Sequence, residues 1–386
     1  MTITPIREPV TRQDIIEETQ KSLWQPDPGI IDVVLGTIAA NRMSGEPVWV
    51  VLVGAPSSGK SVGLGAIGNL PEVIEVDSFT EAGLLSGSSD GTPGLLAQMG
   101  AYGVLVFPDL TVLLSKGSSE RGGSLGMLRR IYDGAFERAI GSKGGKLSWE
   151  GKAGCLGAVT QAVYLTDLGV MGERFLYYPL PHAEHGDRVL AGYSVLEHLG
   201  NQPELRARRA RLVADFFASL SLPDQPPAFS EADQDRLVVL ADLGSRCRSP
   251  IIRDRYKGDA MELVPDPEHL ARLLGSLGQF AAGMRVIGTP EPEVWRLIGQ
   301  VGLGGVHPTR RRILELLVDS VDDHSTAMIA ARCRLPHTTI RRVLEDLGAL
   351  DVIDRVSEHP ELWHASDWLR ESWWAITNPV PNGGKP

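Results

Sequence analysis

Cysteine is scarce in this chain of 386 residues, with three residues far apart at Cys155, Cys247 and Cys333. That spacing excludes a disulfide framework and the paired ligands of a zinc ribbon. The histidines nearest Cys333 are not arranged at metal-ligand spacing either. We therefore expect no structural zinc, and the thiol usage fits the reducing cytoplasm.

Long apolar runs and excess positive charge are also missing. No uninterrupted apolar run approaches the ~20 residues of a membrane span, and the N-terminus lacks the apolar core of a signal peptide. We expect no membrane partner and a cytoplasmic location. Lys and Arg number 38 against 48 Asp and Glu, a net charge of −10. Contact with nucleic acid would therefore require a local basic surface.

The apolar content of 42% is enough for a sizeable core, and at roughly 150 residues per domain the length predicts two or three domains. Short β-branched runs alternate with Gly-rich or helical stretches over residues 48–182, a pattern typical of a parallel α/β sheet covered on both faces. The expected order is an N-terminal helical segment (1–47) with one apolar face over Ile30 to Arg42, the sheet domain (48–182), a helical region (183–302), a compact C-terminal module (303–368) and a partly disordered tail (369–386).

The strongest motif follows the apolar strand Val50 to Val53 and has the form G-x-x-x-x-G-K-[ST]. In a strand–loop–helix context this is a phosphate-binding loop, because its glycines let successive backbone N–H groups point into one concavity. Lys60 is expected to reach the β- and γ-phosphates of a nucleotide, and the Ser61 hydroxyl to bind Mg²⁺. The predicted nucleotide-binding residues are Gly54, Ala55, Pro56, Ser57, Ser58, Gly59, Lys60, Ser61 and Val62.

A carboxylate on the metal side of such a loop should end a neighbouring apolar strand. Asp109, after the run Gly103 to Phe107, is the candidate, so Ser61 and Asp109 form the expected magnesium pair. Many P-loop ATPases carry a Glu directly after this Asp to orient the attacking water, whereas this chain has Leu110. The open candidates for the water-activating acid are Asp77, Glu75 and Glu120.

At this point the core resembles the AAA+ class of P-loop ATPases. The strand Leu156 to Gln161 places Thr160 where that class has a polar sensor of the γ-phosphate. Arg174, before Phe175, resembles the arginine finger that acts on a neighbouring subunit's nucleotide, with a surface ion pair as the alternative. The region 183–302 would be the lid. Within it Arg272 resembles the second sensor, and Arg246 and Arg248 compete for that role.

The C-terminal module has the pattern of a winged helix-turn-helix. Helices are expected over Thr309 to Val318, from an N-cap at Ser325, and over a third segment that Gly348 ends as a C-cap. The strands Val352 to Val356 and Leu362 to Ala365 would form the wing. Residues able to bond phosphates and base edges lie on the third helix: His337, Thr338, Thr339, Arg341 and Arg342.

The predicted fold class is therefore α/β, a P-loop NTPase parallel sheet with a helical lid, followed by an α+β winged helix-turn-helix domain. This order resembles origin-recognition initiators and mobile-element or plasmid ATPases. It implies an ATPase, with ATP and Mg²⁺ as cofactors, that forms a homo-oligomer and engages DNA in replication, maintenance or mobility. One alternative is a nucleotide-switched transcription regulator with little hydrolysis. Another is a DNA-independent ATPase whose C-terminal module docks a protein.

Overall fold

The computed structural model describes residues 9–22, 25, 27–85, 93–140, 145–165, 174–254 and 260–378. The chain divides into two compact units, which are described separately. The first comprises residues 1–227 and 278–298, and the second comprises residues 228–277 and 299–386. None of the described helices is both long enough and apolar enough to cross a membrane.

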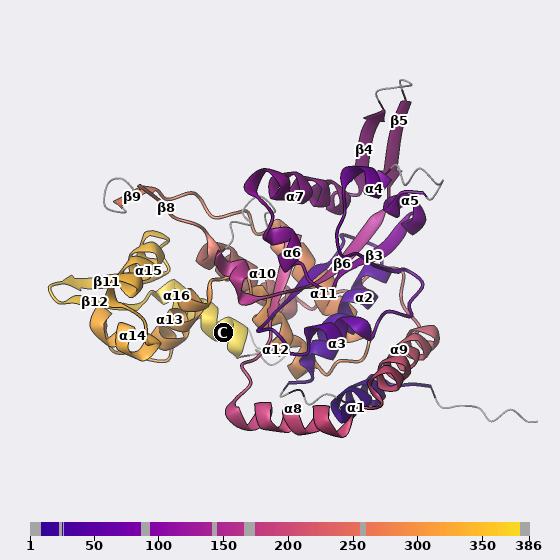
Figure 1. Ribbon diagram of the computed structural model, residues 1–386. Helices are drawn as coiled ribbons and strands as arrows, with labels where there is room; N and C mark the ends of the chain where they lie inside the picture. Colours follow the sequence, from indigo (N-terminus) through magenta and orange to yellow (C-terminus); the bar gives the residue numbers. More distant parts are fainter. Residues whose placement is uncertain are drawn as a thin grey trace, which may run out of the picture. The chain divides into compact units, whose positions relative to one another are not determined.

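The first unit is built on a five-stranded parallel sheet in the order β2-β3-β6-β1-β7 (Figure 1). All five β-branched runs predicted as strands are present, and the mixed α/β class is confirmed. The central strands are apolar and buried along β1 and from Ala153 to the end of β6, as strands covered on both faces require. The bounds are β1 (Trp49–Val53), β2 (Val73–Glu75), β3 (Tyr102–Phe107), β6 (Lys152–Val159) and β7 (Phe175–Pro179).

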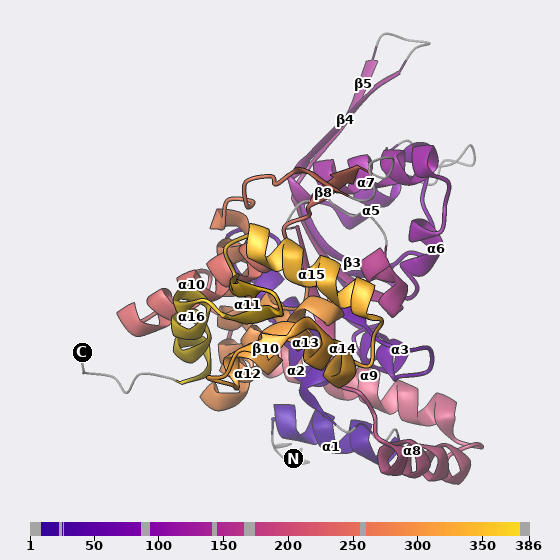
Figure 2. The ribbon, with the colours of Figure 1, turned by 90° about the vertical axis from the view of Figure 1, so that its left-hand side faces the viewer.

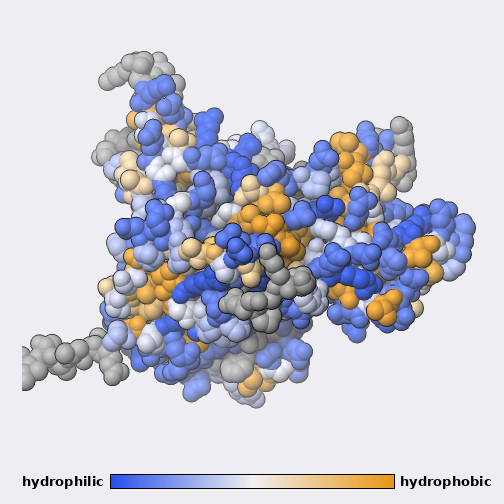
Figure 3. Space-filling model, turned by 180° about the vertical axis from the view of Figure 1, so that it is seen from behind, coloured by the Kyte–Doolittle hydropathy of each residue, from blue (hydrophilic) through white to orange (hydrophobic). Residues whose placement is uncertain are grey.

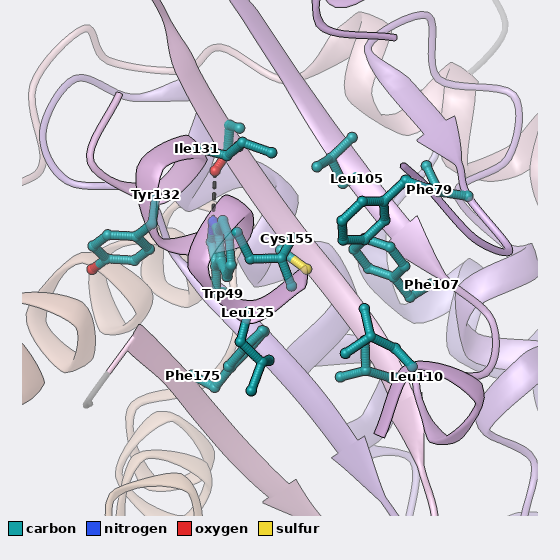
Figure 4. Close-up of a cluster of buried hydrophobic side chains, with 14 of the residues drawn as sticks. Trp49, Phe79, Leu105, Phe107, Leu110, Leu125, Ile131, Tyr132, Cys155 and Phe175 are labelled. Atoms are coloured by element: carbon teal, nitrogen blue, oxygen red, sulfur yellow. Dashed lines mark hydrogen bonds between the residues drawn. The ribbon is translucent and has the colours of Figure 1, made fainter. Parts of the chain in front are cut away.

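Helices cover both faces of this sheet. On one face α7 packs against β6, and the neighbouring residues Trp49, Cys155 and Leu105 on β1, β6 and β3 belong to the same buried cluster. The Trp49 ring lies 5.3 Å from that of Tyr132 (Figure 4). On the other face α2 packs against β6. The helices that lie wholly in this unit are α1 (Arg12–Ser22), α2 (Gly29–Arg42), α3 (Lys60–Gly65), α4 (Glu81–Leu85), α5 (Leu95–Met99), α6 (Thr111–Leu114), α7 (Ser118–Tyr132), the 3₁₀ turn η1 (Gln161–Leu165), α8 (His185–Glu197) and α9 (Gln202–Ser219).

Helix α2 is more deeply buried than its sequence pattern predicts. We expected one apolar face, but every residue from Gly29 to Asn41 is buried. The reason is close packing on two sides. A Cβ at Gly154 of β6 would lie 2.6 Å from the Asn41 side chain, and a Cβ at Gly283 would lie 2.2 Å from the Gly36 carbonyl oxygen. The N-terminal segment is therefore part of the first unit and not an appendage to it.

A two-stranded antiparallel hairpin, β4 (Ala135–Ile140) and β5 (Gly145–Glu150), was not predicted. It lies between α7 and β6 and projects from the sheet (Figures 1 and 2). Its base is fixed by the cross-strand pair Phe136 and Trp149, both buried, and Trp149 Nε1 donates to the Gly100 carbonyl (2.7 Å).

The division into units differs from the predicted lid of residues 183–302. Residues 183–227 and 278–298 belong with the sheet, whereas 228–277 and 299–302 belong to the second unit. The contacts explain this: α9 packs on α1, while α10 packs on α16 and Arg236 Nε donates to the Ile376 carbonyl (3.1 Å). Two helices run from one unit into the other, α11 (Ala271–Val286) and α12 (Glu291–Gly302).

The second unit combines helices with two small antiparallel sheets, one of order β10-β12-β11 and one made of β8 and β9. Apolar side chains gather on the outer surface of the β8–β9 hairpin, among them Ile252 and Leu263 (Figure 3). The elements are α10 (Glu231–Arg248), β8 (Ile252–Asp254), β9 (Ala260–Leu263), α13 (Pro308–Val318), β10 (His324–Ser325), α14 (Thr326–Cys333), α15 (His337–Ala349), β11 (Ile353–Glu358), β12 (Glu361–Ala365) and α16 (Asp367–Thr377).

Two expectations for the C-terminal part were wrong. Gly348 does not end the third helix, since α15 continues through Ala349. A glycine stands at 348 because a Cβ there would lie 3.2 Å from the Trp363 ring. The expected tail from 369 begins inside α16, whose first turn is capped by the Ser366 hydroxyl. Residues 379–386 lie outside the described residues.

Candidate phosphate-binding site and candidate nucleic-acid interface

The glycine-rich loop begins where β1 ends, and its backbone conformation depends on small residues. The Gly54 amide donates to the Val159 carbonyl (3.1 Å), which ties the loop to β6. A Cβ at Gly54 would lie 2.7 Å from Ser58 Oγ, and Gly59 has φ = 86°, in the left-handed region. The loop therefore turns tightly into α3, and the Lys60 and Ser61 amides precede the first bonds of the helix, which Val62 and Gly63 donate to the Gly59 carbonyl.

The Lys60 ammonium group lies inside the loop. Its Nζ donates to the carbonyl oxygens of Gly54 (2.9 Å) and Ala55 (2.6 Å) and lies 3.2 Å from Ser58 Oγ. Burial lowers the pKa of Lys60, and the nearby charge of Asp109 opposes that shift. The Lys60 ammonium group is held by neutral loop oxygens. A bound phosphate could replace these carbonyl acceptors with charged ones, which form stronger hydrogen bonds.

Strand register brings Asp109 and Thr160 to the same edge of the sheet as the loop. Val53, the last residue of β1, pairs with Val159, so Thr160 follows directly beside Gly54. Asp109 follows β3, and the next residue donates its amide to the Ala158 carbonyl (2.8 Å). Lys60, Asp109 and Thr160 thus gather at the carboxyl edge of a parallel sheet, where α/β proteins bind their ligands.

The expected magnesium ligands suit the ion chemically. Ser61 is exposed at the start of α3, and Asp109 is exposed with one carboxylate oxygen accepting from the Thr111 amide (2.9 Å). Hydroxyl and carboxylate oxygens are hard donors, and Mg²⁺ commonly takes only one or two protein ligands beside phosphates and water. Nowhere in the described residues do three His, Cys, Asp or Glu side chains form a metal cluster. Val62 is less suited to ligand binding, since its amide donates to the Gly59 carbonyl (3.0 Å).

The three candidates for a water-activating acid are placed differently. Asp77, just beyond β2, lines a small pocket together with Asp109. Glu120 is held in an ion pair with Lys116 (2.8 Å), and Glu75 lies within β2, opposite Val106. Leu110, which stands where many P-loop ATPases have the water-activating Glu, is buried in the core and supplies no acid at the carboxyl edge of the sheet. Of the three acids, Asp77 is the one beside Asp109.

Arg174 lies at the opposite edge of the sheet from the loop. It directly precedes Phe175, which pairs with Trp49 at the first residue of β1. Its side chain is buried, bonds both carboxylate oxygens of Asp133 (2.9 and 3.2 Å) and stacks over Tyr132. These contacts give Arg174 a structural role within its own subunit. The preceding residues Met171 to Glu173, quoted for the finger motif, lie outside the described residues.

The candidates for a second sensor all belong to the second unit, whereas the loop belongs to the first. Arg272 and Arg248 both pair with Glu268, at 3.4 Å and 2.9 Å. Arg246 stacks over the ring of Trp368, 4.4 Å from its centroid. Each of these guanidinium groups therefore has a partner within the second unit.

The candidate nucleic-acid interface is the first part of α15. His337, Thr338, Thr339, Arg341 and Arg342 are all exposed, while Ile340, Leu344 and Leu347 are buried. The helix before it is capped as expected, with Ser325 Oγ accepting from the Met328 amide (3.2 Å). Arg341 bonds Glu345 (3.0 Å) and lies 3.5 Å from Glu361.

The charge on this face is locally positive although the chain is acidic. From Thr326 to Leu344 there are four Arg and no Asp or Glu. The two acids that follow, Glu345 and Asp346, are bonded by Arg253 (3.3 and 2.7 Å). The sequence could not indicate this neutralisation, because Arg253 lies about 90 residues away in the chain.

Comparison of the sequence with models of known families and with curated proteins finds no match.

Proposed function

We propose that this protein is an AAA+-like ATPase that binds ATP and Mg²⁺ through the loop 54–61 and engages DNA through a C-terminal winged helix. The observation that carries the proposal is the convergence of Lys60, Asp109 and Thr160 at the carboxyl edge beside a glycine-rich turn. The biological setting that fits the resemblance is DNA replication, maintenance or mobility.

In this proposal each group has one task. The loop amides and Lys60 hold the phosphates, because N–H groups and an ammonium group are the donors that a triphosphate requires. Ser61 and Asp109 hold Mg²⁺, which supplies Lewis-acid stabilisation of charge on the phosphates. Thr160, which follows β6 beside the loop, would offer its hydroxyl to the γ-phosphate. Arg174 is left out, since its guanidinium is buried against Asp133.

The DNA part of the proposal depends on the second unit. Helices α13, α14 and α15 are followed by the β11–β12 hairpin, and β10 pairs with β12. This is the order of a winged helix-turn-helix, in which α15 would enter the major groove and the hairpin would be the wing. The exposed Thr and Arg side chains at the start of α15 are suited to phosphates and base edges.

A second candidate function is a nucleotide-dependent switch with little hydrolysis. The buried Leu110 favours it, because the residue after the metal-side acid cannot orient a water. A third is docking of a protein through the winged helix. Steady-state ATP turnover with and without DNA separates the first two, since a switch binds ATP without turnover above background.

The test of nucleotide binding is Lys60→Ala, with Lys146→Ala as the control. Lys146 is an exposed lysine that pairs with Glu137 on the β4–β5 hairpin. Loss of a charged hydrogen-bond donor costs about 1.5–3 kcal/mol, so ATP and ADP should bind roughly 10- to 100-fold more weakly. Calorimetry on the whole chain measures this. Unchanged affinity in Lys60→Ala would remove the basis of the proposal.

A further inference from the structure

Helix α8 carries an apolar face that none of the described residues of the first unit covers. None of its thirteen residues is buried. Figure 2 shows it at the margin of the first unit, away from the sheet. The exposed side chains follow the i, i+1, i+4, i+7 spacing of one helix side and continue into the next turn. This α8 face consists of Val189 (42% exposed), Leu190 (48%), Tyr193 (67%), Leu196 (65%) and Leu199 (67%).

Local hydrogen bonds explain where α8 begins, but no packing within the described first unit explains why its residues are apolar. Its N-terminus is closed by a capping box between Glu184 and Asp187. At its other end, His198 Nε2 lies 2.6 Å from the Lys21 carbonyl oxygen of α1. An isolated helix of this length is marginal in water, and helices in proteins are stabilised mainly by burying an amphipathic face. The α8 face is therefore suited to a partner.

We infer that the α8 face is the contact through which two copies of this chain associate. At about 60–120 Å² for each fully exposed large apolar side chain, the exposed fractions of these five offer roughly 170–350 Å² per copy. A standard interface buries about 800 Å² on each side, somewhat more than half of it apolar. One helix face thus supplies roughly two-fifths to three-quarters of the apolar surface that each side of such an interface buries. In a two-fold contact both copies contribute this same face.

Charge on the helix fits a second copy better than a membrane surface. Asp187 and Glu197 are opposed by Arg188 alone, so the segment is slightly acidic. Helices that lie on anionic membranes carry a strongly basic polar face. Each copy of α8 carries a net charge of only −1, so the repulsion between two copies is small.

The test is the mass of the whole chain in solution, measured by light scattering without nucleotide or DNA. The wild type should give at least twice the 41.7 kDa of the monomer. The double variant Tyr193→Glu plus Leu196→Glu should shift to the monomer. Val321→Glu is the matched control, because Val321 is 90% exposed in the second unit and should leave the mass unchanged. Since α8 buries no residue, the double variant should keep its circular dichroism spectrum.

A crosslinking measurement examines the same surface directly. The three native cysteines are buried, so a maleimide should react mainly with the new cysteine in Tyr193→Cys. A bismaleimide should join two copies of Tyr193→Cys but not of Val321→Cys. A monomeric wild type, equal masses for wild type and double variant, or equal crosslinking at 193 and 321 would each overturn the inference. Flotation of the wild type with anionic vesicles, lost in the double variant, would also overturn it in favour of a lipid surface. None of these results depends on ATP or DNA binding.

Discussion

Replacing Asp32 with alanine should strongly destabilise the first unit. Asp32 is fully buried in α2, and both its oxygens are bonded by Arg12, with 2.6 Å between Nη2 and Oδ2. Thr289 Oγ1 also donates to Oδ1 (2.9 Å), and the hydrogen bonds to Asp32 raise the pKa of Arg12. Removing one partner of a buried pair costs about 3–5 kcal/mol, because the other charge stays buried without its counterpart.

The Arg12 side chain is 16% exposed and can gain some water, so the cost should lie near the lower limit, about 3 kcal/mol. The control is Glu137→Ala, which removes one side of an ion pair exposed on both sides and should cost about 0–1 kcal/mol. Hydrogen exchange of the α2 amides reports the free energy of opening for this unit alone. Equal changes in the two variants would refute the reasoning.

Two further predictions concern the proposed chemistry. Asp77→Asn should reduce ATP turnover at least tenfold while leaving ATP affinity nearly unchanged, because Asp77 lines a pocket with Asp109 and that pocket is not lined by residues 54–61. Turnover and calorimetry check it, and unaltered turnover would exclude Asp77 as the water-activating acid. Arg341→Ala plus Arg342→Ala should weaken retention of duplex DNA at ~0.1 M salt and lower the salt dependence by up to about 2 in log–log slope, since each lost phosphate contact removes about 0.9. Unchanged retention would favour a protein partner for α15.

The sheet could be predicted from the sequence because its signals are local. Each of the five runs is a short, nearly continuous apolar segment, and the loop motif directly follows one of them. The N-cap at Ser325 was recognisable for the same reason, since the cap bond spans three residues. Local patterns therefore gave the strands, the loop and the starts of the C-terminal helices.

What the sequence could not predict depends on contacts between distant segments. The partner of Arg174 is Asp133, 41 residues earlier, and that contact decides whether the arginine is buried. The β4–β5 hairpin did leave a signal, because the runs that hold Phe136 and Trp149 flank a Gly-rich stretch of sequence. The division of residues 183–302 between the two units left no such signal in the sequence. It depends on α9 packing on α1 and α10 packing on α16.

Strand order bears on the choice between an ATPase and a switch. At about 4.8 Å per strand, the ends of β6, β3 and β2 lie roughly 5, 10 and 14 Å from the end of β1 across the sheet. Thr160 and Asp109 follow the two nearer strands, and Asp77 follows the third. Asp77 thus lies farther from the loop across the sheet than Thr160 or Asp109, and in the proposed ATPase it would act on a γ-phosphate only through an intervening water. Slow turnover that depends on Asp77 is what this geometry allows for an ATPase. Turnover at background in a protein that still binds ATP is what it allows for a switch.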